Sequence, residues 1–492
     1  MDAGSSSTTT PYVDKDVDMA ASDENQQKLE DLIDQWTAMT FEDSAVPTLV
    51  QKVLSNEQEE YHYGLIGLRK LLSKENDPPI QAVIDAGVVP RLVQLTSLSS
   101  PKKVQFEAAW CLTNVCSGTT EQTRYVIENG ALASFLSLLK SDDSEVVEQS
   151  VWGLGNIAGD NSEFRDQILQ QNGTEELVKV LSKATSLSLK RNGAWALSNF
   201  CRGKPAPPFA LVFKAIPQLC ELLAVETDSQ TLVDVAWGLS YLTDSNEGIS
   251  SVLSCNAVPK LIEFLSHTDI AIVTPCLRTI GNIISGNDDQ TSVVLKEKNF
   301  IPELFKLADN KKKAIRREAF WTLSNITAGT PVQFEAIMGN PAYVEKLIYA
   351  AKNDVHEVKK EALWALSNST ATCTPAQIIR ILDNGVFGCL VDLLVEQDTR
   401  FLMVALEGVE NCLKWGEQFN IKDESGTNKF VVEMENRGGI DKVEALQAHQ
   451  SNDVYEKAVN IIERYFAGEE DLDYAEQPAV GIAAGNNNGF TF

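Results

Sequence analysis

A short block of residues recurs along this chain at a nearly constant interval, and this interval limits the folds that the chain can adopt. The block reads WCLTN, WGLGN, WALSN, WGLSY, RTIGN, WTLSN, WALSN and EGVEN, beginning at positions 110, 152, 195, 237, 278, 321, 364 and 407. Successive blocks therefore start 41 to 43 residues apart. Such self-similarity indicates repeated units, each of which buries its apolar face against its neighbours.

A second marker keeps the same interval and predicts a turn in each repeat. It stands near Gly87, Gly130, Gly173, Ala257 and Gly385, with Gly or Asn at the turn itself. After one such turn the apolar residues keep helical spacing, in the stripe Leu132, Phe135, Leu136 and Leu139. Either Asp143 or Ser144 can then cap the next helix.

Repeats of this length with two or three helices are typical of the armadillo and HEAT class. We therefore predict an all-α protein, an armadillo-repeat right-handed superhelical solenoid of about ten repeats over residues 45–466. Residues 1–44 form an acidic tail that we expect to be mostly disordered, with a possible short helix at 29–39. Residues 467–492 are expected to form a second acidic, disordered tail.

Charge and composition exclude several classes of function. The net charge of -27 opposes nucleic-acid binding and favours basic partners. No apolar run approaches the roughly 20 residues of a membrane span. The nine cysteines include no CxxC, and the four histidines lie far apart, so we expect neither disulfides nor a metal site. No cofactor motif or catalytic set is visible, and an enzyme is not predicted.

Tryptophan and asparagine, four residues apart, are the informative part of the block. Trp152 and Asn156 lie one helical turn apart and outside the apolar stripe that forms the core face. Asparagine is a poor residue for a helix interior, so its recurrence in register suggests that it binds a ligand. Complete pairs are Trp110 with Asn114, Trp152 with Asn156, Trp195 with Asn199, Trp321 with Asn325, and Trp364 with Asn368.

The chemistry of these two side chains predicts an extended, lysine-rich peptide as the ligand. An Asn amide can bond both the N–H and the C=O of a peptide backbone. Neighbouring Trp rings form slots for the stem of a lysine and attract its ammonium group. Tyr241 and Arg278 interrupt the pattern, which favours two separate basic clusters on the ligand. Asp160, one turn beyond Asn156, can pair with an inserted ammonium group.

The segments WGLGNIAGD, LSNFCRGKPAPPF, GLSYLTD, WTLSNITAG and LEGVENCLKWGE resemble the importin-alpha family, whose members bind nuclear localisation signals. The resemblance implies a nuclear import adaptor found in cytoplasm and nucleus, with an export receptor bound at the C-terminal repeats. It implies a major peptide site at Trp110, Asn114, Gly118, Thr123, Trp152, Asn156, Asp160, Trp195 and Asn199. It implies a minor site at Arg278, Asn282, Thr291, Trp321, Asn325, Glu361, Trp364 and Asn368.

One feature departs from that family. Its members begin with a basic segment that binds importin-beta and, when free, folds back onto the groove, whereas the first 50 residues here hold Lys15 and Lys28 against eleven acids. We therefore hypothesise a groove without self-inhibition, and leave open both importin-beta binding and a shortened N-terminus. A scaffold or sequestering protein for basic peptides, with the same groove and no transport, is the alternative.

Overall fold

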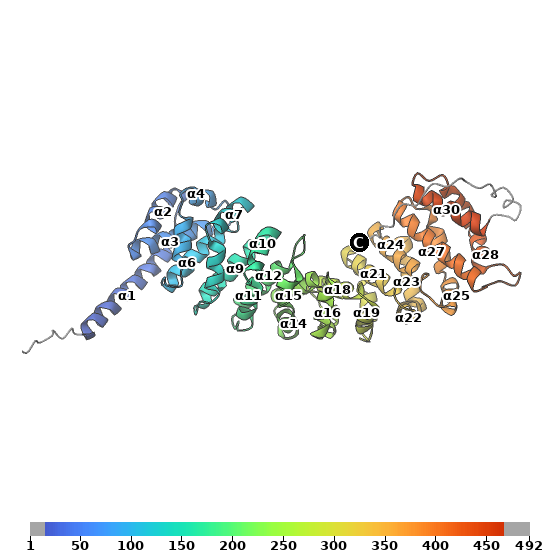
Figure 1. Ribbon diagram of the computed structural model, residues 1–492, viewed down its shortest axis with the longest axis horizontal. Coiled ribbons are helices and arrows are strands. Elements are labelled where there is room, and N and C mark those ends of the chain that lie inside the picture. The colour runs from blue at the N-terminus through green and yellow to red at the C-terminus, as the bar shows by residue number, and fades with distance from the viewer. Residues whose placement is uncertain (1–14, 467–492) are drawn as a thin grey trace, which may run out of the picture. The chain divides into compact units, whose positions relative to one another are not determined.

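The computed structural model describes residues 15–466, with side chains from Gln27 onward, and Figure 1 shows that helices form this part of the chain. One isolated antiparallel bridge, between Lys422 and Asn428, is the extended pairing within it. The predicted all-α armadillo fold is confirmed. The chain divides into two compact units, here called unit 1, ending at Lys260, and unit 2, beginning at Leu261. Over residues 15–466, no helix combines the length and the apolar character needed to cross a membrane.

Unit 1 repeats a set of two shorter helices followed by a longer one. Its elements are α1 (Lys15–Ala38), η1 (Asp43–Ala45), α2 (Val46–Leu54), α3 (Gln58–Leu72), α4 (Ile80–Asp85), α5 (Val89–Leu95), α6 (Lys102–Val115), α7 (Thr120–Glu128), α8 (Ala131–Leu138), α9 (Ser144–Asp160), α10 (Ser162–Gln170), α11 (Gly173–Leu181), α12 (Leu187–Cys201), α13 (Phe209–Val212), α14 (Ala215–Val225), α15 (Ser229–Leu242) and α16 (Asn246–Ser254). The helix α17 (Val258–Phe264) lies at the division between the units.

Unit 2 follows the same plan. Its elements are α18 (Ile270–Ile284), α19 (Asp288–Leu295), α20 (Phe300–Leu307), α21 (Lys313–Thr327), α22 (Pro331–Met338), α23 (Pro341–Asn353), α24 (His356–Asn368), α25 (Pro375–Asp383), α26 (Val386–Asp392), η2 (Leu393–Val395), α27 (Thr399–Gln418), α28 (Lys429–Asn436), α29 (Gly439–Leu446) and α30 (Asn452–Tyr465). The recurring block lies on α6, α9, α12 and α15 in unit 1 and on α18, α21, α24 and α27 in unit 2, which we call the ladder helices. Within each unit, successive ladder helices pack against one another.

The turn that marks each repeat adopts a left-handed backbone conformation. Gly87, Gly130 and Gly385 have φ of 70°, 93° and 76°. In two repeats the preceding asparagine takes this role instead of the predicted position, since Asn172 and Asn256 have φ of 62° and 55°. Asparagine tolerates this conformation better than other residues with a side chain, so it replaces glycine at the turn.

The predicted core stripe is confirmed. Leu132, Phe135, Leu136 and Leu139 are all buried, as are Val147, Val151, Leu154 and Ala158 of α9. Of the two candidate caps for α9, Asp143 is the one used, and its carboxylate accepts from the backbone N–H groups of Glu145 and Val146. The carboxylate also interacts favourably with the positive end of the helix dipole.

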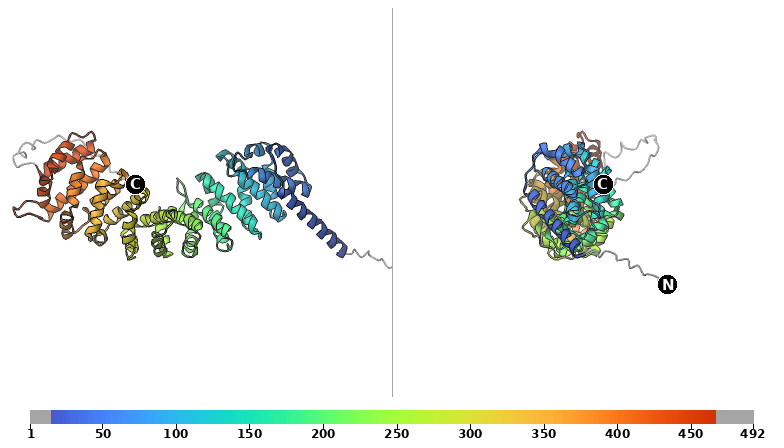
Figure 2. Two further views of the ribbon diagram at one scale, coloured as in Figure 1. Left: turned by 180° about the vertical axis from the view of Figure 1, so that it is seen from behind. Right: turned by 90° about the vertical axis from the view of Figure 1, so that its left-hand side faces the viewer.

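Helix α1 packs on the first repeat through its C-terminal turns. The Trp36 ring meets Tyr63 and His62 edge-on, with centroids 5.6 and 6.3 Å apart, and Lys70 bonds the Thr37 carbonyl. The short helix expected at 29–39 is part of α1, which begins earlier, at Lys15. The first half of α1 contains Ala, Met, Glu and Gln, which have high helix propensity. Because this half has few large apolar residues, the apolar spacing used to predict helices did not reveal it. Figure 2 shows α1, in dark blue, extending away from the rest of unit 1. The expected disorder of residues 1–14 and 467–492 lies outside the described residues.

Arg165 of α10 is the largest fully buried side chain and holds the loop that follows the ladder helix α12. Its Nη1 donates to the carbonyl groups of Arg202 (2.7 Å) and Pro205 (3.0 Å). Its Nε and Nη2 both donate to Asp166 Oδ1, at 2.9 and 2.7 Å. A single buried guanidinium thus joins two consecutive repeats by charge-assisted hydrogen bonds.

We predict that Arg165→Met destabilises unit 1 by about 3 kcal/mol, because the variant loses the charge-assisted bonds from a buried guanidinium to two carbonyl groups and leaves Asp166 without its partner. Urea unfolding measures the loss, and hydrogen exchange should speed up over residues 202–208. The matched control is Arg124→Met, whose guanidinium pairs with Glu163 at the surface (side chains 42% and 57% exposed). That exposed pair should contribute under about 1 kcal/mol. Equal losses in the two variants would contradict the role given to Arg165.

Candidate functional site

The tryptophans of unit 1 form a row because four ladder helices lie side by side. Trp110, Trp152, Trp195 and Trp237 come from α6, α9, α12 and α15, and α9 packs between α6 and α12. None of these rings is buried, and Trp152 is 40% exposed. In the last of the four helices, Tyr241 stacks on Trp237 with ring centroids 5.7 Å apart. At Tyr241, where the Trp–Asn pattern is interrupted, the row therefore contains a second aromatic ring beside Trp237.

A glycine on the preceding ladder helix makes room for a Trp ring in each unit. A Cβ atom on Gly155 would lie 2.3 Å from the Trp195 ring, and one on Gly281 would lie 2.5 Å from the Trp321 ring. Both glycines stand immediately before the asparagine of their own block. Each ring thus packs directly on the backbone of the preceding repeat, which fixes the position of the slot that the ring borders.

The asparagines are also held by the preceding repeat. Asn156 Nδ2 donates to the Thr113 carbonyl (3.1 Å) and Asn199 Nδ2 to the Gly155 carbonyl (3.2 Å). In unit 2, Asn368 Nδ2 donates to the Ser324 carbonyl at 3.0 Å. In the part of the chain that the structure describes, no group donates to the side-chain oxygens of these three residues. The oxygen of each fixed amide is therefore available to accept from the backbone N–H of a ligand.

Two predicted asparagines differ from this arrangement. Asn114 Nδ2 donates to the Ser73 hydroxyl (2.9 Å) in place of a carbonyl group. Asn325 Nδ2 is buried and has no hydrogen-bond partner among the described residues, which is unusual for a buried amide. A third, Asn282, is 6% exposed and is thus about as buried as Asn199, which is 4% exposed.

The structure brings Asp160 next to the loop that contains Gly118, as the predicted lysine pocket requires. Asp160 Oδ1 accepts from the Thr120 hydroxyl at 3.2 Å, and its Oδ2 accepts from Asn161 Nδ2 at 2.8 Å. Thr123, by contrast, is fully buried, and its hydroxyl donates to the Cys116 carbonyl at 3.3 Å. Thr123 thus lies behind the loop, where it holds the loop in place.

The candidate site of unit 2 has a similar organisation. Thr291 is buried, and its hydroxyl donates to the Ile284 carbonyl at 2.9 Å, so it occupies the place that Thr123 has in unit 1. Trp364 is 42% exposed. Burial raises the pKa of Glu361, which lies on α24 one turn before Trp364, although Arg317 opposes the rise.

Arg69 and Glu107 are functional candidates that the sequence analysis missed. Arg69 lies on α3 at the ladder position of the first repeat, 41 residues before Trp110, so the repeat interval could have identified it. Its guanidinium carbon is 4.6 Å from the centroid of the Trp110 ring. Its Nε and Nη2 donate to the two carboxylate oxygens of Glu107, at 2.8 and 3.1 Å.

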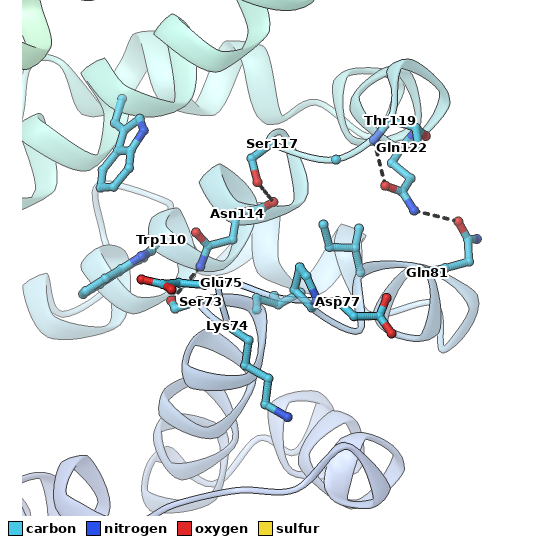
Figure 3. A pocket seen from close by; sticks show the side chains of 15 residues that line it. Ser73, Lys74, Glu75, Asp77, Gln81, Trp110, Asn114, Ser117, Thr119 and Gln122 are labelled. Carbon is cyan, nitrogen blue, oxygen red and sulfur yellow. Dashed lines mark hydrogen bonds between the residues drawn. The ribbon is translucent and has the colours of Figure 1, made fainter.

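A cleft of about 780 Å³ adjoins the start of the unit 1 row. Figure 3 shows the side chains that line it. Trp110, Asn114, Gly118 and Trp152 line one side of it. The other side comes from the segment after α3 and from α4, with Ser73, Lys74, Glu75, Asp77 and Gln81. Lys74, the cation in this lining, pairs with Asp43 at 2.7 Å and is not paired with the two carboxylates beside it. Those carboxylates, of Glu75 and Asp77, have no ion-pair partner in the described residues. The cleft can therefore hold polar or basic groups.

Comparison with known proteins agrees with this architecture. The chain matches the Armadillo/beta-catenin-like repeat family over residues 76–117, 119–159 and 245–285, and the Atypical Arm repeat family over residues 428–479. The crystal structure of an engineered protein aligns with a TM-score of 0.75 and 27% identity, covering 86% of this chain and 99% of that one. The fold and the site together define an armadillo-repeat protein whose ladder helices present rows of Trp and Asn.

Relatives specify the family. Importin subunit alpha-1b of Oryza sativa subsp. japonica is 40% identical over 477 residues, which cover 96% of this chain and 85% of that protein. Importin subunit alpha-2 of Arabidopsis thaliana is 46% identical, covering 90% and 83%, and importin subunit alpha-B of Dictyostelium discoideum is 48% identical, covering 87% and 82%. The chain belongs to the importin-alpha family, and as a member of it is a nuclear import adaptor.

We predict that affinity for a lysine-rich peptide falls about fourfold between pH 7.5 and 5.5. Burial raises the pKa of Asp234 to about 6, and this residue precedes Trp237 by one turn on α15. An inserted ammonium group needs the ionised carboxylate, so affinity is full above the raised pKa and is lost as the pH falls through it. Fluorescence anisotropy, with a peptide free of His and acids, measures the change. Asp234→Asn should bind equally at both pH values; an unchanged pH dependence in this variant would exclude Asp234 as its origin.

Proposed function

We propose that the chain binds lysine- and arginine-rich localisation segments of cargo proteins as extended peptides along its two rows of Trp and Asn. One observation carries the proposal: each held asparagine uses its amide nitrogen to bond the preceding ladder helix and presents its oxygen to a ligand. A fixed acceptor in successive repeats, as at Asn156 and Asn199, suits an extended peptide backbone, which offers N–H groups at regular intervals.

The slots beside the rings supply the preference for basic residues. Trp152 has a large exposed surface on which a lysine stem can pack, and cation–π attraction contributes roughly 0.5–2 kcal/mol for each inserted residue. Each backbone hydrogen bond contributes about 1 kcal/mol. Four or five such contacts, less the cost of ordering the peptide, correspond to micromolar to nanomolar binding.

Charge supports the same ligand. The net charge of -27 attracts basic segments and speeds their association. In unit 1, Asp160 beside Gly118 provides the carboxylate that pairs with an inserted ammonium group. Cargo binding of this kind places the protein in both cytoplasm and nucleus, with an export receptor at the last repeats, α28 to α30, and importin-beta as the candidate carrier.

We expect Asp160→Lys to weaken binding of a fluorescent lysine-rich peptide by about 30- to 150-fold, because an attractive charge pair is replaced by a repulsive one. Anisotropy titration of the full chain measures the affinity. Asp142→Lys makes the same charge change at the opposite end of α9, where the side chain is 84% exposed, and should alter affinity less than about threefold. Equal effects of the two variants would mean that overall charge, and not the pocket, controls binding.

Removing residues 1–44 tests whether the N-terminal segment inhibits the groove. This segment holds Lys15 and Lys28 as its basic residues, so it offers no lysine cluster to the slots. We therefore expect the trimmed and complete chains to bind the peptide with affinities within about a factor of two. A large gain on trimming would show that the segment competes with cargo.

A further inference from the structure

Each row of tryptophans in the two units has an Arg–Glu pair at its start. In unit 1, Arg69 lies over the Trp110 ring at 4.6 Å and bonds both carboxylate oxygens of Glu107. In unit 2, Arg278 lies over the Trp321 ring at 5.3 Å; its Nη2 donates to Glu318 Oε2 at 2.8 Å, and its Nε lies 2.6 Å from Oε1.

The sequence positions of the two sets correspond. Each arginine occupies the Trp position of the preceding repeat, 41 residues before Trp110 and 43 before Trp321. Each glutamate precedes its tryptophan by three residues and lies about one helical turn away. Because the same three residue types recur at corresponding positions, the arrangement is a property of the row and not of one local contact.

Arg69 reaches Trp110 from the side opposite to the rest of the row. Helix α6 packs against α3, which carries Arg69, and against α9, which carries Trp152. The Trp110 ring therefore has an open slot toward α9 and a guanidinium toward α3. The guanidinium is firmly held, since the side chains of Arg69 and Glu107 are 12% and 9% exposed and share two hydrogen bonds.

We propose that Arg69 ends the row of lysine slots in unit 1 and so sets the number and register of the basic residues that the row accepts. This inference rests on the proposed function. The guanidinium occupies the ring face that a further lysine would use, and its charge repels a second cation at that place. Residues of the peptide beyond Trp110 then meet the part of the cleft beside Glu75 and Asp77, and the tryptophans that line this cleft are Trp110 and Trp152, both already in the row.

The test compares the full chain with the variant Arg69→Ala/Glu107→Gln, in which the cation and the side chain that covers the Trp110 ring are both removed without leaving a buried unpaired carboxylate. Peptides carry three to six consecutive lysines between Gly-Ser flanks, and anisotropy gives their affinities. For the natural chain, affinity should stop rising with lysine number once the slots are full. For the variant, the longest peptides should gain about two- to thirtyfold, because the freed face of Trp110 accepts one more lysine.

Register is measured separately by photo-crosslinking. Peptides with benzoylphenylalanine at either end are irradiated on the protein, and mass spectrometry locates the attachment. We expect attachment within residues 73–81 in the natural chain and displacement onto α3 in the variant. Unchanged attachment, together with an unchanged dependence on lysine number, would overturn the inference.

Two further variants keep the result interpretable. Arg191→Met/Asp228→Asn removes a comparable Arg–carboxylate pair (2.6 and 3.0 Å) between α12 and α15 and should alter neither readout. Arg69→Gln retains a polar partner for Glu107 and replaces the double variant if thermal unfolding shows the latter to be unfolded. If the natural chain binds none of the peptides, the proposed function fails. If it binds them, and the Arg69 variants give the same affinities and attachment sites as the natural chain, only the inference about Arg69 fails.

Discussion

The hydrogen bond from a ladder asparagine to the backbone of the preceding ladder helix unites the fold and the candidate site. Asn156 and Asn199 each donate a side-chain amide N–H to a backbone carbonyl of the preceding repeat. That bond holds two repeats in register and, at the same time, fixes where the amide oxygen points. A residue with poor helix propensity is thus used because its side chain serves the stacking of repeats and, on the proposed function, the recognition of a peptide.

The glycine before the asparagine also helps to position the side chains of the row. Gly155 allows the Trp195 ring to lie against the backbone of α9, within 2.3 Å of where a Cβ would stand. Adding that Cβ would move the ring away from the helix and widen the slot. Because the ring and the amide are both positioned by the preceding repeat, the geometry of the row follows from repeat stacking and needs no ligand to form it.

The repeat interval predicted the helical fold, the core stripe of α9 and the residues of both rows. It did not predict that Thr123 and Thr291 are buried: each bonds the carbonyl at the end of the preceding ladder helix, a contact that depends on how the chain turns after that helix. Arg69 was missed because its segment, RKLLS, lacks both the tryptophan and the asparagine of the block, whereas RTIGN at Arg278 keeps the asparagine. A hydrophobic period can be recognised within one segment of the sequence, but no single segment shows which side chains pair across repeats.

Acidic residues three positions before the ladder tryptophans fall into two groups, those paired with an arginine of the protein and those without an ion pair. Glu107 and Glu318 occupy it at the start of each row, and both are engaged by an arginine of the preceding repeat. Asp234 and Glu361 occupy it later in each row and have no ion pair in the described residues. Burial raises the pKa of both, as it does the pKa of Glu318, and Arg317 and Arg278 oppose the rise at Glu361. An acid whose charge is partly desolvated and not internally neutralised gains most when a cation is brought beside it. On the proposed function, the acids that already have an arginine partner stand at the start of each row, and the two that lack an ion pair offer their charge to an inserted lysine.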